Sequence, residues 1–217
     1  LRFRKEGNLR LLSHHDLMRC LERMLRRAAL PFRSTQGFNP KPRLTFPLSL
    51  ALGIVGCEEV LELELDQPVP PAEVRARLAQ QAPAGLELLD IRPIAAKTTA
   101  QVRRVCYRLP VPPERTAGLA ERVAAVLAAP ECWVERSRPQ PRRVNLRPYL
   151  NNLCILPDAV EMDLGVTPTG TARPDEVLGL LGLADLLAAG AVLERTKVEL
   201  HDEVEVSEEH EPPEGSA

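Results

Sequence analysis

The sequence predicts an α+β protein made of two consecutive sandwiches, in each of which helices cover one face of an antiparallel sheet. Three observations predict this class. Short apolar runs with a period of two residues alternate with longer amphipathic stretches of helical period. The order of these segments in residues 1–97 returns in residues 98–203. The 217 residues are 44% hydrophobic, enough for one large core or two small ones, although only 3% are aromatic.

The first half begins with a strand at residues 1–5, a turn, and a short extended stretch at 9–12. Ser13 and Asp16 have the spacing of a capping box, so we expect a helix from Ser13 that ends near Ala29, before Pro31. The later elements of this half are three strands, a helix and a further strand, expected at 32–35, 44–46, 60–65, 70–82 and 86–94.

The second half repeats this plan. Its predicted elements are a strand, a helix, two strands, a helix interrupted at Gly182 and a final strand, at 102–111, 113–129, 153–156, 160–166, 174–187 and 192–200. Both halves approach the split βαβ order of a ferredoxin-like sandwich. No residue-level repeat accompanies this order, so the duplication rests on element order alone. We expect tandem ferredoxin-like domains at 1–97 and 98–203, followed by a disordered acidic tail at 204–217.

Several classes of protein are disfavoured by composition. The five cysteines are odd in number, widely spaced and free of Cys-x-x-Cys pairs, so we expect reduced core residues and no metal or iron–sulfur site or other cofactor in this chain. No run of about 18 apolar residues predicts a membrane span, and we expect a cytoplasmic protein. The first residues, LRFRKEGN, contain neither a signal peptide nor an initiator Met, which indicates a trimmed fragment or a domain of a longer protein.

The net charge of −2 conceals a strong asymmetry. Residues 1–43 hold 11 Lys and Arg against 3 Asp and Glu, which predicts a polyanion-binding surface. The predicted helix places four arginines opposite its apolar stripe, at a spacing that suits a phosphate backbone: Arg19, Arg23, Arg26 and Arg27. The alternative is a solvated face neutralised by Glu22, by the acidic strand around residues 62–64, or by the tail.

The loop GFNPKPR, residues 37–43, follows this helix. Gly37 permits a positive φ, and the prolines bias Asn39 and Lys41 toward extended conformations. Lys41 and Arg43 add charge. Phe38 either stacks on a base or packs into the core, and packing is favoured for this side chain alone. For the loop as a whole we favour a binding role.

His14 and a second basic segment each allow two interpretations. His14 lies in the first helical turn, where the helix dipole disfavours protonation, so it is a weak candidate for a general base that activates a ribose 2′-OH. The alternative is a histidine that packs or hydrogen-bonds against the adjoining strand, and no second catalytic group is evident. A second basic segment, from Arg136 to Arg147, is either a linker or a second patch.

The chain also carries a recognisable set of motifs: RFRK at 2–5, SHHDLMR at 13–19 and QGFNPKP at 36–42, followed by NLRPYL, RPDEVL and ERTKVEL at 145–150, 173–178 and 194–200. This pattern resembles the radical SAM-linked protein family, a domain of unknown function (DUF2344). The resemblance covers nearly the whole chain. His15 stands where the pattern favours an apolar residue, which puts weight on His14 instead.

The resemblance implies a partner: a B12-binding-type radical SAM protein that is fused to the domain or encoded beside it, near genes for RNA processing and ribosomal proteins. The chain has no Cys-x-x-x-Cys-x-x-Cys cluster, which fits an accessory domain whose partner performs the iron–sulfur chemistry. The tandem plan with a basic loop is also similar to the CRISPR repeat-processing endoribonucleases, a likeness at the level of fold only.

We therefore predict a non-catalytic accessory domain that binds tRNA or rRNA and presents it to a radical SAM enzyme. The predicted RNA contacts are Arg19, Arg23, Arg26, Arg27, Gly37, Phe38, Asn39, Lys41 and Arg43. Two alternatives stay open: a metal-independent endoribonuclease that uses His14, and a protein–protein adaptor that binds the radical SAM partner through the same basic face.

Overall fold

The structure, a computed structural model, describes residues 1–95, 99–137, 140–201 and 203. After a first strand and a 3-10 helix at Gly7–Leu11, the first half continues through a long helix to its last strand. Its strands and α-helices are β1 (Arg2–Lys5), α1 (His14–Arg27), β2 (Leu44–Thr45), β3 (Val55–Val60), β4 (Glu62–Leu63), α2 (Pro71–Ala79) and β5 (Leu86–Asp90).

The second half has seven strands and three α-helices among the described residues. They are β6 (Val102–Pro110), α3 (Leu119–Ala128), β7 (Trp133–Arg136), β8 (Arg142–Asn145), β9 (Leu150–Ile155), β10 (Ala159–Thr167), β11 (Gly170–Thr171), α4 (Pro174–Leu180), α5 (Ala184–Ala188) and β12 (Glu194–Leu200).

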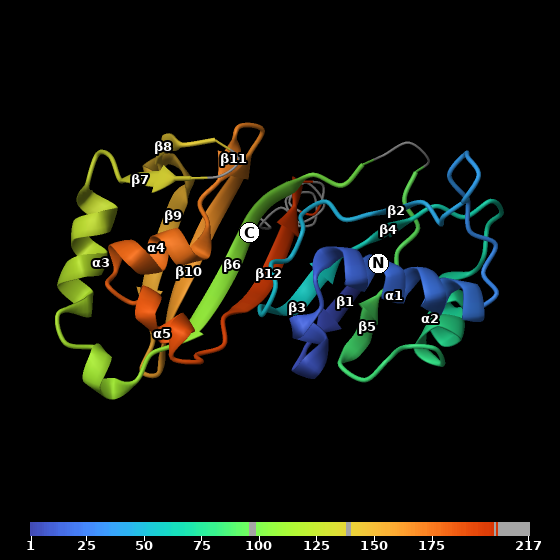
Figure 1. The fold of residues 1–217 in the computed structure, drawn as a ribbon, viewed down its shortest axis with the longest axis horizontal. Coiled ribbons are helices and arrows are strands. Elements are labelled where there is room, and N and C mark those ends of the chain that lie inside the picture. Colours follow the sequence, from blue (N-terminus) through green and yellow to red (C-terminus); the bar gives the residue numbers. More distant parts are fainter. Residues whose placement is uncertain (96–98, 138–139, 202, 204–217) are drawn as a thin grey trace, which may run out of the picture.

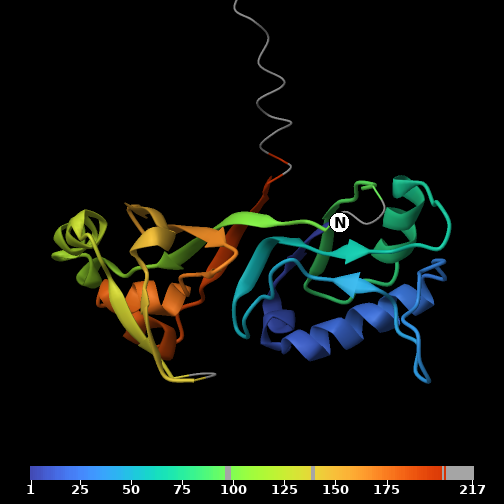
Figure 2. The same cartoon turned by 90° about the horizontal axis from the view of Figure 1, so that it is seen from above.

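One eight-stranded sheet runs through both halves (Figure 1). Its order is β11-β10-β6-β12-β3-β1-β5, with β9 also paired to β10. All of these pairings are antiparallel except the one between β12 and β3. Helices α1, α4 and α5 lie on the same side of the sheet (Figure 2). The predicted α+β class with a largely antiparallel sheet is confirmed.

Two apolar clusters fill the molecule. One lies under α1 and α2 and contains Phe3, Leu21 and Leu78; the other lies under the helices of the second half. Leu50 and Ile54 precede β3 in the chain but belong to the second cluster. The domain division at residue 97 stays a prediction, since residues 96–98 lie outside the described part, as do residues 204–217 of the predicted tail.

The junction between the halves is the parallel pairing of β12 with β3, in which Arg195 lies opposite Gly56. Arg195 donates from Nε to Glu59 Oε1 at 2.8 Å, and a second nitrogen also donates to this carboxylate. Both side chains are almost fully buried. A Cβ at Gly56 would lie 2.4 Å from Glu59 Cγ, so the glycine makes room for this ion pair.

Several predicted elements differ from the structure. The strand expected at 32–35 is reduced to isolated bridges from Phe32 to Leu65 and from Ser34 to Pro42. Proline has no N–H to donate, so a regular ladder cannot continue along this segment. The strand expected at 60–65 begins at Val55 and is interrupted at Leu61. The predicted interruption of the last helix is confirmed, since Gly182, with φ +68°, separates α4 from α5.

Candidate nucleic-acid interface

Helix α1 forms one wall of the candidate interface, and its first residue is fixed by Ser13. The Ser13 hydroxyl oxygen accepts from the Asp16 amide at 3.2 Å and donates to the Asp16 carboxylate at 2.7 Å. The Ser13 half of the predicted capping box is confirmed, whereas the Asp16 carboxylate bonds the Ser13 hydroxyl and not the Ser13 amide. Leu17, Leu21, Met24 and Leu25 are buried against the sheet. The same register places His14, Met18 and Glu22 along one half-buried side of the helix, where they line the cavity described below.

The loop after α1 forms the opposite wall as an irregular two-stranded ribbon. The Arg43 amide donates to the Arg33 carbonyl and the Thr35 amide donates to the Lys41 carbonyl, both at 2.8 Å. Backbone hydrogen bonds join Arg33 and Arg43 to Glu64, just beyond β4. Gly37, at the tip, has a φ of +133°, a positive value of the kind that glycine permits. The ribbon is therefore shaped by its backbone and held at its base by the strand segment beside it.

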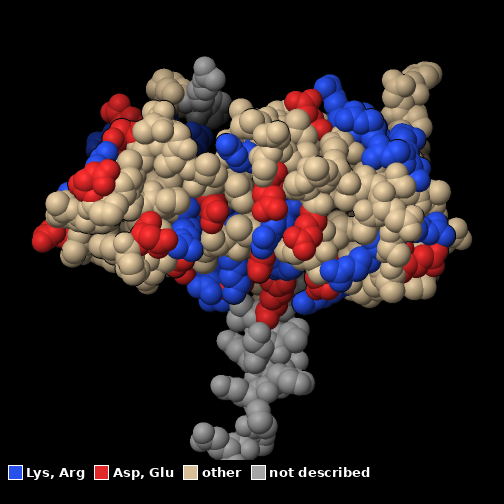
Figure 3. Space-filling model, turned by 90° about the horizontal axis from the view of Figure 1, so that it is seen from below, with Lys and Arg blue, Asp and Glu red and all other residues tan. Residues whose placement is uncertain are grey.

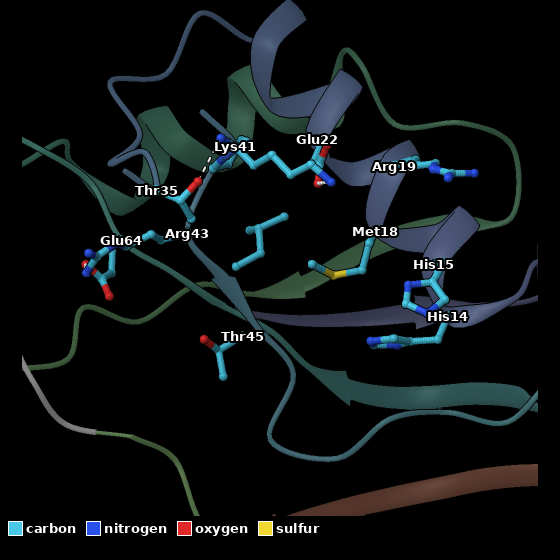
Figure 4. Close-up of a pocket in the computed structure, with 12 residues that line it drawn as sticks. His14, His15, Met18, Arg19, Glu22, Thr35, Lys41, Arg43, Thr45 and Glu64 are labelled. Atoms are coloured by element: carbon cyan, nitrogen blue, oxygen red, sulfur yellow. Dashed lines mark hydrogen bonds and ion pairs between the residues drawn. The ribbon is translucent and has the colours of Figure 1, made fainter. Parts of the chain in front are cut away.

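An open cavity of about 470 Å³ lies between α1 and the ribbon. Its lining side chains include His14, Met18 and Glu22 from the helix, and Lys41 and Arg43 from the ribbon. Figure 4 shows Met18 and the His14 ring pointing toward the middle of the cavity, with Lys41 reaching toward Glu22.

The ribbon cations that line the cavity have acidic partners at long distances. Lys41 Nζ lies 4.0 Å from Glu22, and Arg43 lies 3.4 Å from Glu64, which Arg33 also approaches at 3.8 Å. Surface ion pairs of this kind contribute about 0–1 kcal/mol. The predicted acidic strand thus neutralises the ribbon rather than the arginine face of the helix, and it does so weakly.

The four predicted arginines of α1 all lie exposed, and Figure 3 shows basic side chains gathered at the end of the molecule that holds this helix. They do not act alike. Arg26 donates to the Pro40 carbonyl at 2.9 Å, and Arg27 donates to the Gln81 side chain and carbonyl at 3.0 Å. These two guanidinium groups tie down the ribbon and the end of α2. Sequence reasoning missed this because both acceptors come from other segments.

Arg19 and Arg23 are the more available pair. Arg19 pairs with Asp16 at 3.3 Å, and its guanidinium points away from the middle of the cavity (Figure 4). Arg23 makes no hydrogen bond or ion pair with any residue in the part of the chain that the structure describes. Both can therefore contact an external anion without breaking an internal hydrogen bond of the backbone.

Gly37, Phe38 and Asn39 form the exposed tip of the ribbon and do not line the cavity. The expectation that Phe38 packs into the core is wrong, because its relative exposure is 106%. The ribbon carries the ring away from both apolar clusters, and Pro42 is the residue of the loop that becomes buried. Stacking of Phe38 on a base stays a prediction.

His14 is half-buried and packs edge-on against Phe46, with 5.2 Å between ring centroids; the His15 ring lies 6.0 Å away. Burial lowers the pKa of His14 below its ordinary value, and positive charge on His15 and Lys5 lowers it further. The imidazole is thus held in its neutral form at neutral pH. This environment suits both the packing role and the general-base role, and both stay predictions.

Lys5 is a neighbour that sequence reasoning missed. Its side chain is fully buried, its ammonium donates to the Leu12 carbonyl at 3.2 Å, and burial lowers its pKa. The strand period gave a usable signal, because Phe3 and Lys5 must share one face of β1 and Phe3 is the obvious core residue.

The second basic segment is neither an open linker nor a uniform patch, since it contains the hairpin β7–β8. Arg136 is buried against Glu176 at 2.6 Å, and Arg147 donates to the Leu150 carbonyl at 2.8 Å. Arg143 stacks over the exposed Trp133 ring at 5.0 Å. Arg138 lies outside the described residues.

Comparison with known proteins identifies the family. A family model described as "uncharacterized protein conserved in bacteria (DUF2344)" matches residues 1–174. The chain belongs to this family. Neither curated proteins nor solved structures gave a significant match. The DUF2344 match contains α1, the whole ribbon and every residue of the cavity, so the candidate interface is part of the region that defines the family.

The described residues of this DUF2344 chain contain no group of three or more His, Cys, Asp or Glu side chains that could hold a metal ion. No helix among them is both long and apolar enough to cross a membrane.

Proposed function

We propose that the face formed by α1 and the ribbon binds RNA, either tRNA or rRNA, and that the chain serves as an accessory domain to a radical SAM enzyme in the cytoplasm. One observation carries the RNA part: exposed cations from two separate elements, Arg19 on α1 and Lys41 and Arg43 on the ribbon, surround one open cavity. Their acidic partners lie 3.3 to 4.0 Å away. Such cations can exchange a weak carboxylate partner for a phosphate.

The energetic basis is electrostatic. Each Lys or Arg that contacts a phosphate releases condensed counterions, which favours binding without any sequence preference. Arg19 and Arg23 on the helix, with Lys41 and Arg43 on the ribbon, would supply these contacts. Phe38 at the ribbon tip would add a stacking contact with an unpaired base, which is worth about 1–3 kcal/mol in single-strand binding proteins.

The radical SAM partner is proposed from the resemblance of the motifs to the radical SAM-linked family.

We also propose that each half follows the ferredoxin-like plan. In its favour, β9-β10-β6-β12 is an all-antiparallel order in which β10 separates the two strands joined by α3. In the first half, β5, β1 and β3 would be three strands of the same plan. The first half departs from the plan at β3, because β12 of the second half pairs with β3 while β2 pairs with β4 in a separate small sheet.

Filter binding at low salt tests the RNA part, with bulk tRNA and rRNA fragments as probes. Arg19→Glu/Arg23→Glu should bind at least about tenfold more weakly than the wild type, because two phosphate contacts become repulsions. Arg92→Glu, which reverses an exposed arginine beyond β5, is the matched control and should bind normally. Equal affinity of the double variant and the control would reject the proposed face.

The environment of His14 favours a second candidate function, a metal-independent endoribonuclease. A neutral imidazole lines a cavity that also holds Lys41 and Arg43, so it could accept the proton of a ribose 2′-OH. Incubation of the protein with total RNA in EDTA decides this: cleavage by the wild type that disappears in His14→Gln supports it. No cleavage, or equal cleavage by both proteins, removes it.

Co-purification with the radical SAM enzyme distinguishes a protein–protein adaptor from the RNA-binding accessory domain. If the chain is an RNA-binding accessory domain, we expect it to co-purify with RNA and to lose that RNA after nuclease treatment. A protein complex that survives both nuclease and high salt, together with no RNA binding, would favour the adaptor.

A further inference from the structure

The cavity between α1 and the ribbon has two chemically different ends. At one end are the half-buried Met18 side chain and the His14 ring, which packs against Phe46. At the other end are Lys41 and Arg43 with their acidic partners (Figure 4). The cavity volume of about 470 Å³ lies within the range of small-molecule sites. A ligand that matches both ends needs a flat, polarizable ring and an anionic group.

At the end with Lys41 and Arg43, two carboxylates already occupy the place that a ligand's anionic group would take. The Glu22 carboxylate lies 4.0 Å from Lys41 Nζ, longer than a hydrogen bond. The Glu64 carboxylate is divided between Arg43 at 3.4 Å and Arg33 at 3.8 Å. A phosphate that reached both cations could form charge-assisted hydrogen bonds of about 2.7–2.9 Å with them, shorter than the present separations from the two carboxylates.

The apolar end suits a base. The Met18 thioether is polarizable and makes favourable contacts with aromatic rings. The His14 imidazole offers a second flat surface in its neutral form. Thr35 and Thr45 also line the cavity, and the Thr35 hydroxyl oxygen accepts from the Lys41 amide at the basic end.

We infer that this cavity is a nucleotide subsite of the RNA-binding face, in which a phosphate replaces Glu22 and Glu64 as the partner of Lys41 and Arg43 while the base lies against Met18. The inference rests on the proposed RNA-binding function. It goes beyond that function because a basic face can bind the RNA backbone without admitting any single nucleotide.

The test compares 5′-AMP, 5′-UMP and inorganic phosphate as probes, titrated into the whole chain and followed by amide chemical shifts and calorimetry. Both nucleotides should bind saturably and more tightly than phosphate. Lys41→Gln should weaken nucleotide binding about fivefold, the effect of losing one exposed charged contact. Glu22→Gln/Glu64→Gln should strengthen it, because the competing carboxylates are gone. Met18→Glu should weaken it by repelling the ligand.

Arg23→Gln is the matched control, since Arg23 lies on the same helix but outside the cavity. It should weaken RNA binding and leave nucleotide binding unchanged. Normal RNA binding by a protein that takes up no nucleotide would overturn the subsite and keep the proposed function. A wild-type protein that binds neither RNA nor nucleotides would overturn both the proposed function and the subsite. Equal affinity for phosphate and nucleotides, tighter binding of a phosphopeptide, or weaker nucleotide binding by the double Glu variant would each overturn the subsite.

Discussion

Two sets of ion pairs in this molecule use the same side-chain chemistry in opposite environments. Arg195 and Glu59 lie buried at the junction of the two halves, and Arg195 also donates to the Leu48 and Ser49 carbonyls. Lys41 and Arg43 lie exposed beside the cavity, with Glu22 and Glu64 at looser distances. A buried charge must keep its partner, whereas an exposed one can exchange it at little cost. The first set therefore specifies the fold, and the second is available to a ligand.

The buried set also anchors the chain segment that follows the ribbon. The carbonyls that Arg195 holds follow Phe46 closely in the chain, and Phe46 packs against both Phe3 and His14. A residue of the last strand thus secures the segment that borders the cavity. The candidate interface depends on both halves of the chain, although every residue that lines it comes from the first.

The largest expected effect comes from breaking the buried pair. Arg195→Met should lower the free energy of unfolding by about 3–5 kcal/mol, because it leaves the Glu59 carboxylate buried without its partner. Denaturant unfolding followed by circular dichroism measures this loss. Glu59→Leu/Arg195→Met removes both charges and should recover most of the stability. A single variant as stable as the wild type would contradict the structural role of the pair.

The exposed set should show the reverse behaviour. Lys41→Glu/Arg43→Glu should weaken RNA binding about tenfold or more while changing the free energy of unfolding by less than about 1 kcal/mol. The same filter-binding and denaturant measurements apply. A variant that loses stability as well as affinity would show that these residues hold the ribbon, and the contrast between the two sets would disappear.

Lys5 is a buried charge that forms no ion pair with the residues that the structure describes, and its replacement tests what such a charge costs. Burial lowers the pKa of Lys5, so its charged form is disfavoured in the folded protein below the ordinary lysine pKa of 10.5. Lys5→Met should raise the free energy of unfolding by about 1 kcal/mol at neutral pH, despite the lost hydrogen bond to Leu12. The gain should shrink as pH rises toward 10.5. A destabilised variant at neutral pH would show that the ammonium stabilises the fold.

His14 gives the smallest expected effect. Its folded-state pKa lies below the ordinary value of 6.5, so the unfolded chain takes up a proton more readily. The stability contributed by this group is complete above pH 6.5 and is lost as pH falls through the folded-state pKa. His14→Gln should therefore lose less stability than the wild type between neutral and mildly acidic pH, by under about 1 kcal/mol. Parallel pH profiles for both proteins would contradict this assignment.

The features that can be predicted from the sequence are those that depend on interactions between residues close together in the chain. The sequence predicts the helix start at Ser13 and the apolar stripe of α1, because both follow from residues a few positions apart. The structural use of Arg26 and Arg27 does not follow, because Pro40 and Gln81 reach these side chains only through tertiary packing. The Glu59–Arg195 pair spans 136 residues and has no local signature.

The most direct test of RNA binding by the exposed cations is a salt titration of the wild type and of Arg19→Gln/Lys41→Gln/Arg43→Gln. The logarithm of the affinity should fall linearly with the logarithm of the salt concentration, and the variant should show a shallower slope, by about 0.7 for each lost contact to single-stranded RNA. A wild-type affinity that hardly changes with salt, or identical slopes for the two proteins, would contradict the account.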